Sequence, residues 1–244
     1  MTGAKLVVGG HAGIGRDDRW NLYMFPDLFI AFSQKGFNWA KKVNPFIKIV
    51  KIPHGVNLEK FNPRVKPAEL NLEKPIFVTV SHLVPYKRVG ETVRAVAELK
   101  MGSLLILGEG PLEKEIDELG NNLLNKDGKR KRYLRSVTSH NQVAKYLRAA
   151  DVFTLVSEPS EAFGLVYLEA MACNLPVVAT DDPLRRELIS ESGILVKNPE
   201  NIGEYAEALE QAAKIDWGDK PVNQAEKFGW EKIAARYLEE FMAI

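Results

Sequence analysis

The stretch that decides the fold runs from Ile76 to Leu107 and has the sequence IFVTVSHLVPYKRVGETVRAVAELKMGSLLIL. It opens with an apolar, β-branched run of five residues and continues with apolar side chains near helical spacing between Arg88 and Lys100. It ends on a second apolar run, 104–107. This alternation predicts a strand buried on both faces, an amphipathic helix and a second buried strand, as in a parallel β-α-β unit.

The same alternation continues toward the end of the chain. Further strands are predicted at 133–137, 152–156, 176–179 and 194–196, and helices from 111 and at 142–150, 163–172, 185–189, 202–214 and 224–241. We therefore predict an α/β domain over residues 76–244, built on a doubly wound, mostly parallel, Rossmann-like sheet. In such a sheet, ligands bind beyond the carboxyl ends of the strands.

The residues before this domain contain fewer elements. Apolar runs lie at 5–8, 28–32 and 47–52, with a helix predicted over 34–42. These are too few for a closed sheet, so we expect residues 1–52 to be a small α/β remnant of a first domain. Residues 53–75, with four prolines, are predicted to be an interdomain linker.

The glycine-rich stretch at 7–15 has its glycines in the wrong order for a dinucleotide-binding loop. The residues that follow it, 16–20, show no helical period. We predict a flexible loop for this stretch.

Composition narrows the functional classes. The 244 residues are 45% hydrophobic and 27% charged, with a formal net charge of +1, which suits an ordinary globular protein and argues against nucleic-acid binding driven by overall charge. The single cysteine, Cys173, excludes an internal disulfide and a cysteine-rich metal site. No apolar run is long enough for a membrane span. We expect a cytoplasmic protein that acts on a membrane, if at all, peripherally at its inner face.

The segment with most chemical content is EAFGLVYLE, from Glu161 to Glu169. Gly164 would let a ligand approach the backbone where a helix begins, and the free N–H groups of the first turn suit a phosphate. Glu161 would lie beside that anion, whereas Glu169 would accept hydrogen bonds from hydroxyl groups. A phosphate flanked by hydroxyls describes a nucleotide sugar. The alternative is that Glu161 is a helix-start charge favoured by the helix dipole and that Glu169 is a solvated helix residue. However, Glu169 has apolar neighbours on most sides.

This segment, continued by EAMACNLPVVAT to Thr180, resembles the nucleotide-sugar half of the retaining group 1 (family four) glycosyltransferases of the GT-B fold. The resemblance covers residues 47–244 and extends to the motifs VSHLVPYKR at 80–88, GEGP at 108–111, ADVFTLVS at 150–157, SGILV at 192–196 and IPHGVNLEKF at 52–61. It implies transfer of a sugar from a nucleotide diphosphate donor to a hydroxyl of a glycan or lipid-linked acceptor, without a metal ion or other cofactor.

The resemblance also implies roles for individual residues. Lys87 would neutralise the donor diphosphate, and Glu161 would contact the transferred sugar near the reacting carbon. The donor-binding residues implied are His82, Lys87, Arg88, Gly108, Phe163, Gly164, Leu165, Val166 and Glu169. His82 departs from the family, which usually has an arginine there, so Arg88 would supply the second cation or donor binding would differ.

Two other hypotheses remain. Because the first domain is short, the chain could be a donor-binding subunit or fragment that is inactive without a partner chain. A GT-B-like epimerase or nucleotide-sugar sensor would also keep the phosphate site. We expect apolar surface around Leu28, Phe29, Ile30, Phe32 and Trp39 to stay uncovered. Residues 1–52 would then contact a partner chain or a second copy.

Overall fold

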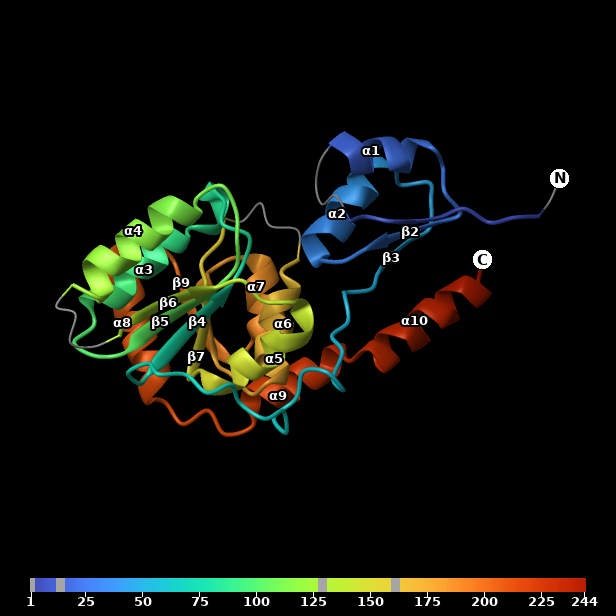
Figure 1. Cartoon of the computed structure of the whole chain (residues 1–244). Helices are drawn as coiled ribbons and strands as arrows, with labels where there is room; N and C mark the ends of the chain where they lie inside the picture. The colour runs from blue at the N-terminus through green and yellow to red at the C-terminus, as the bar shows by residue number, and fades with distance from the viewer. Residues whose placement is uncertain (1–2, 12–15, 127–130, 159–162) are drawn as a thin grey trace. The chain divides into compact units, whose positions relative to one another are not determined.

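The computed structural model describes residues 3–11, 16–126, 131–158 and 163–244, with the side chains of residues 16 and 17 excepted. The chain divides into two compact units (Figure 1). Unit 1 consists of residues 1–56, 161–165 and 227–244, and unit 2 of residues 57–160 and 166–226. The carboxyl-terminal segment thus belongs with the amino-terminal residues, whereas the sequence analysis places it in the second domain.

Unit 2 is built on a parallel sheet that has six strands in the described part of the chain. The strands are β4 (Ile76–Val80), β5 (Ser103–Leu107), β6 (Tyr133–Ser136), β7 (Val152–Leu155), β8 (Val177–Thr180) and β9 (Gly193–Val196). Their order in the sheet is β6-β5-β4-β7-β8-β9. The strand order reverses between β4 and β7, and this switch point is where doubly wound sheets bind their ligands. The predicted fold class is confirmed.

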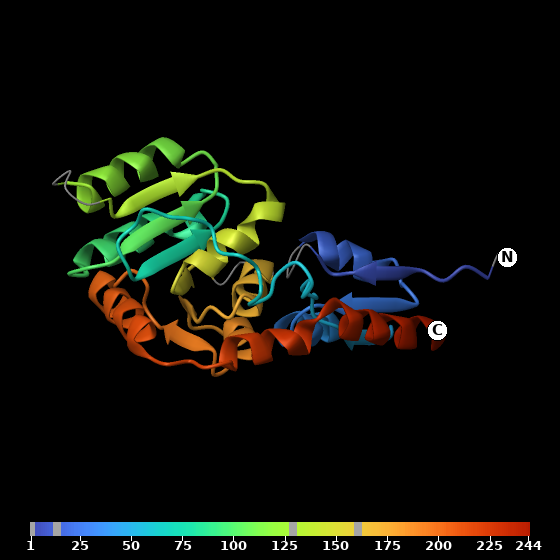
Figure 2. The same ribbon diagram turned by 60° about the horizontal axis from the view of Figure 1, so that its bottom comes forward.

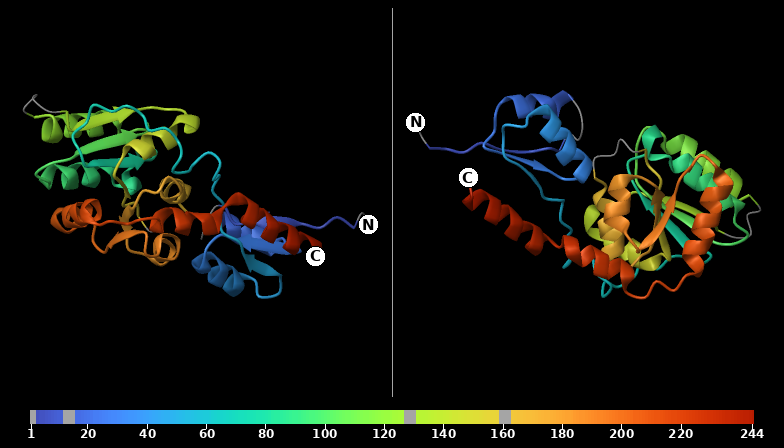
Figure 3. Two further views of the ribbon diagram at one scale, coloured as in Figure 1. Left: turned by 90° about the horizontal axis from the view of Figure 1, so that it is seen from below. Right: turned by 180° about the vertical axis from the view of Figure 1, so that it is seen from behind.

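Helices cover both faces of this sheet. They are α3 (Val89–Glu98), α4 (Glu113–Leu124), α5 (His140–Ala149), α6 (Leu165–Ala172), α7 (Pro183–Ile189), α8 (Ile202–Lys214) and α9 (Lys220–Ala225). The main core joins α3, α4 and α8 to one face, through side chains such as Val93, Ile116 and Leu209. Helices α5, α6 and α7, coloured yellow to orange, lie on the other face (Figures 1 and 3). Because connections between parallel strands are right-handed, a reversal of strand order places the connecting helices on opposite faces of the sheet.

The predicted helix over 224–241 is wrong as a single element. A 3₁₀ turn, Glu226–Phe228, follows α9, and α10 (Trp230–Met242) begins after Gly229. The backbone at this break pairs with Val56: Val56 N–H donates to Phe228 O at 2.8 Å, and Trp230 N–H donates to Val56 O at 3.1 Å. Backbone groups that pair with Val56 are not available for the hydrogen bonds of a continuous helix, so the helix is interrupted at Gly229.

Unit 1 contains a parallel sheet of β1 (Val7–Gly9), β2 (Leu28–Ala31) and β3 (Ile49–Lys51), in that order. Helices α1 (Arg16–Tyr23) and α2 (Gln34–Val43) pack with this sheet around Leu22, Phe29 and Ala40. The red α10 runs beside the strands (Figure 2), where Arg236 donates from Nη2 to Lys51 O at 2.6 Å.

Helix α1 corrects the sequence analysis, which predicts no helix after residue 15. The helix is eight residues long, and its described buried residues are Asp18 and Leu22, one turn apart. Only Leu22 of these two residues is apolar, so the sequence shows no helical repeat of apolar residues here. Residues 12–15 of the predicted loop lie outside the described residues.

The expected apolar patch is also wrong in its members. Leu28, Phe29, Ile30 and Phe32 are buried, and Trp39 is half-buried. Phe29 lies in the core of unit 1, and Phe32 stacks on His54 of the same unit. The exposed apolar side chains of unit 1 include Trp20, Tyr23, Met24, Phe25 and Phe46. Helix α1 and Phe46 are linked through Asn44, which donates from Nδ2 to Leu22 O and accepts from Phe46 N–H. None of the described helices is long and apolar enough to cross a membrane.

Candidate functional site

A pocket of about 370 Å³ opens at the carboxyl ends of β4, β5 and β6 in unit 2. The ends of β4 and β5 line it with residues 80–82 and 107–109, and the segment after β6 contributes Val137, Thr138, His140 and Val143. The pocket lies at the edge where the parallel sheet predicts a ligand site.

The turn after β5 is shaped by glycines. A Cβ atom on Gly108 would collide with the carbonyl of Ser81, so only glycine fits there. Gly110 has a φ of +153°, and Leu83 N–H donates to Glu109 O at 2.8 Å, which presses the two loops together. His82 lies exposed at this junction. Both His82 and Gly108, predicted donor-binding residues, therefore line the same pocket.

Glu169 is held by a residue that the sequence analysis did not select. The Glu169 side chain is 13% exposed, and its Oε1 lies 2.7 Å from Nε2 of His140. His140 Nδ1 in turn lies 2.6 Å from Nζ of Lys60. Because an ammonium group can only donate, Nδ1 accepts and Nε2–H donates to Glu169. The solvated-surface alternative for Glu169 does not hold. No sequence spacing links His140 to Glu169, because the sheet brings their helices together.

Lys87 ends a short 3₁₀ helix after β4, Pro85–Lys87, and Arg88 is the residue that caps it. Arg88 adopts a left-handed conformation with φ +53°, and its Nη2 donates to Glu200 Oε1 at 2.9 Å. Lys87 Nζ lies 5.4 Å from the ring centroid of Tyr86. The loop is tied to the exit of β7, since Glu158 N–H donates to Tyr86 O at 2.8 Å. The predicted diphosphate cation thus stands at the switch point of the sheet.

The glycine-containing segment divides between the two units. Glu161, predicted to be catalytic, lies outside the described residues. Phe163, Gly164 and Leu165 belong to unit 1, whereas Val166 and Glu169 belong to unit 2. Gly164 has a φ of +82° directly before α6 begins, a conformation that glycine adopts without strain.

Phe163 joins an aromatic cluster in unit 1. Its ring meets His54 edge-on at 4.9 Å between centroids, and His54 stacks on Phe32 at 3.9 Å. His11 lies 5.3 Å from His54. Burial, and then the charge of His11, lower the pKa of His54 to about 4. Phe32 and His54 follow β2 and β3, and His11 follows β1, so the cluster marks the carboxyl edge of the unit 1 sheet. In the described part of the chain, no group of three His, Cys, Asp or Glu side chains could hold a metal ion.

Comparison with known proteins identifies a family and relatives of this chain. The family model of the glycosyl transferases group 1 matches residues 62–229. A D-inositol 3-phosphate glycosyltransferase of Paenarthrobacter aurescens is 30% identical over 207 residues, which cover 78% of this chain and 50% of the relative. The chain thus spans about half the length of this curated relative.

Solved structures show the same fold. The pneumococcal O-GlcNAc transferase GtfA, solved with UDP and GlcNAc, matches 97% of this chain and 52% of its own with a TM-score of 0.75 and 20% identity. Anabaena HepE, solved with UDP, matches 98% of this chain and 72% of its own with a TM-score of 0.78 and 18% identity. Together with the family match over more than half of the sequence, these findings show that the chain belongs to the glycosyl transferases group 1.

Proposed function

We propose that unit 2 binds a nucleoside diphosphate sugar, with the nucleoside in the pocket at the ends of β4, β5 and β6. The observation that carries this proposal is the carboxylate of Glu169, which is largely buried and held by His140, a residue of the pocket wall. Its second oxygen is suited to accept from ribose hydroxyls. GtfA and HepE, both solved in complex with UDP, support a nucleotide in a chain of this fold.

The diphosphate would lie at the switch point between β4 and β7. Lys87 brings a positive charge to this edge, and the first turn of α6 within unit 2, at Val166 and Tyr167, adds the positive end of a helix dipole. Both favour charge on the departing diphosphate more than on the intact donor, which is the condition for catalysis. Glu161 would accept from hydroxyls of the transferred sugar. The proposed reaction is metal-independent transfer with retention to a hydroxyl of a glycan or lipid-linked acceptor, in polysaccharide or glycoconjugate synthesis.

A donor-binding role without transfer by the isolated chain is the second candidate. The half-length match to the relative favours it, because the curated glycosyltransferase contains about as much sequence again as this chain covers. A partner chain, or a second copy meeting residues 1–52, would then supply the acceptor side. The exposed Trp20 and Phe46 are consistent with such a contact.

Titration calorimetry tests the shared part of both candidates. The purified chain is titrated with UDP, GDP and ADP in the presence of EDTA, and then with sugar conjugates of the nucleotide that binds. Saturable binding without a divalent ion supports the proposal, and failure of all three nucleotides at millimolar concentration refutes it. Transfer assays with the isolated chain, and with a candidate partner added, then separate the enzyme from the donor-binding subunit.

A further inference from the structure

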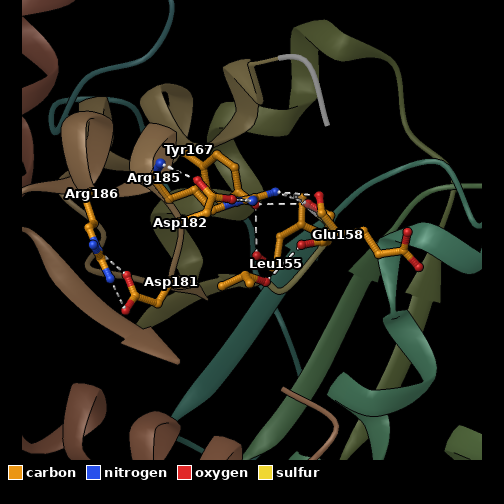
Figure 4. A network of polar contacts seen from close by, with 9 residues as sticks. Leu155, Glu158, Tyr167, Asp181, Asp182, Arg185 and Arg186 are labelled. Carbon is orange, nitrogen blue, oxygen red and sulfur yellow. Dashed lines mark hydrogen bonds and ion pairs between the residues drawn. The ribbon is translucent and has the colours of Figure 1, made fainter. Parts of the chain in front are cut away.

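Arg185 of α7 is 1% exposed and makes polar contacts in several directions (Figure 4). Its Nη1 donates to Oδ2 of Asp182. Its Nε donates to Tyr167 Oη at 3.1 Å, and its Nη2 donates to Ser157 Oγ at 2.6 Å and to Glu158 O at 3.3 Å. One planar group thus holds residues from three segments in a fixed arrangement.

The segments it holds are those on which the proposed diphosphate site depends. Ser157 and Glu158 form the exit of β7, on one side of the switch point. The backbone of Glu158 is held on both sides, because its carbonyl accepts from Arg185 and its N–H donates to Tyr86 O, next to Lys87. Tyr167 lies in the first turn of α6, and its hydroxyl donates to Leu155 O at 2.9 Å. Arg185 is therefore linked through the backbone of Glu158 to the loop between β4 and α3, which contains Lys87. Through the hydroxyl of Tyr167 it is linked to α6.

Stability alone does not explain a buried guanidinium at this position. Desolvation of an ion pair often costs as much as the attraction returns, and apolar replacements are frequently no less stable. What the pair does provide is geometry. Asp182 is fixed as the N-cap of α7, where its Oδ1 accepts from Arg185 N–H at 2.9 Å, so the guanidinium position is set by the helix.

We infer that Arg185 is a positioning residue for the diphosphate site. It holds Glu158, and through it the loop of Lys87, in a fixed position relative to Tyr167 in the first turn of α6. It touches no substrate itself. The inference rests on the proposed donor site, and the residues of the nucleoside pocket are separate from the Arg185 contacts.

The test compares a nucleoside monophosphate with the matching diphosphate by calorimetry, in the full chain and in Arg185→Lys. The dissociation constant of the monophosphate divided by that of the diphosphate isolates the contribution of the second phosphate to affinity. Lysine cannot reach Tyr167, Ser157 and Glu158 together, so the ratio should fall about tenfold while the monophosphate affinity stays within about twofold. Arg186→Lys is the matched control, because Arg186 is the next residue of α7 and pairs with Asp181 through an exposed side chain (Figure 4). It should leave both constants unchanged.

A double-mutant cycle identifies the route. If Arg185 acts through the Lys87 loop, Lys87→Met and Arg185→Lys should together cost less than the sum of the single losses in diphosphate affinity. Should Arg185→Lys fail to fold by circular dichroism, Ser157→Ala removes one acceptor of the guanidinium and should lower the ratio about threefold.

The possible results separate the positioning role of Arg185 from the proposed donor site. An unchanged ratio, or a parallel loss of both affinities in a folded variant, overturns the positioning role and leaves the proposed donor site standing. If the unaltered chain binds neither nucleotide, the proposed function falls and the inference with it.

Discussion

His140 Nε2–H donates a hydrogen bond of 2.7 Å to Oε1 of Glu169, joining the start of α5 to the middle of α6. Lys60 completes the arrangement by donating to Nδ1 of the same ring, and Phe61 packs against that ring at 5.5 Å between centroids. The result is a carboxylate with one oxygen occupied by the protein and a defined orientation for the other. A preoriented acceptor of this kind suits a hydroxyl-bearing ligand.

Removal of the Glu169 carboxylate should weaken nucleotide binding directly. Glu169→Ala is expected to lower the affinity for a nucleoside diphosphate by about 1.5–3 kcal/mol, the range for hydrogen bonds to a charged group. Calorimetry measures this change. Glu207→Ala, an exposed glutamate on α8, is the control and should change nothing. Equal affinities for the Glu169 variant and the unaltered chain would remove Glu169 from the site.

Loss of His140 should have a smaller effect of the same kind. His140→Phe keeps a ring beside Phe61 but cannot donate to Glu169, so the carboxylate loses its orientation and keeps its charge. We expect the nucleotide affinity to fall by about 1 kcal/mol. In a background of Glu169→Ala the same substitution should add little, because the two residues act as one unit. Full additivity of the two changes would contradict this.

Glu161 lies outside the described residues, and its role is still a prediction from the resemblance. Glu161→Ala should leave the affinity for the nucleoside diphosphate unchanged and weaken binding of the sugar conjugate by about 1.5–3 kcal/mol. Parallel titrations with the two ligands measure the difference. If Glu161 and Glu169 variants lose diphosphate binding equally, the division into sugar and ribose partners is wrong.

The fold of unit 2 could be predicted from the sequence because short apolar, β-branched runs alternate with longer segments of helical period. The run at 76–80 is β4 without any change of boundary. The α8 helix likewise spans the predicted 202–214. Helix α1 could not be predicted, since Asp18 and Leu22 form too short a buried stripe to show a period. The break at Gly229 depends on pairing with Val56, a contact that no local pattern encodes.

Gly164 could be selected from the sequence because its place before a predicted helix indicates a close approach of ligand and backbone, whereas Gly108 was implied by the family resemblance. The structure gives both glycines a physical reason, a close contact with Ser81 O at Gly108 and a positive φ at Gly164. His140 and Arg185 could not be selected from the sequence, because their partners Glu169 and Ser157 are 29 and 28 positions away. The surface prediction failed for a related reason: Leu28 and Phe29 belong to a strand that its own unit covers.

The half-buried His54 of unit 1 should make the protein sensitive to acid. The pKa of His54 is lowered to about 4 from 6.5, by burial first and then by His11. The unfolded chain therefore binds more protons between these values, and stability falls as the pH drops through this window. We expect the free energy of unfolding to fall by about 2 kcal/mol or less between pH 6.5 and 4. Thermal unfolding at a series of pH values measures this change. His54→Asn should flatten the pH dependence, and an unchanged slope would exclude His54 as its cause.

The central claim is that the pocket at the ends of β4, β5 and β6 holds the nucleoside of a nucleotide donor. A titration of the ¹⁵N-labelled chain with the nucleoside diphosphate that binds, followed by NMR, tests it residue by residue. We predict saturable shifts of the backbone amides of Gly108, Glu109 and Glu169, with little change in the depression beside α4 that Glu113 and Glu118 line. Saturable shifts confined to α4 or to unit 1, with the amides of Gly108 and Glu169 unmoved, would contradict it.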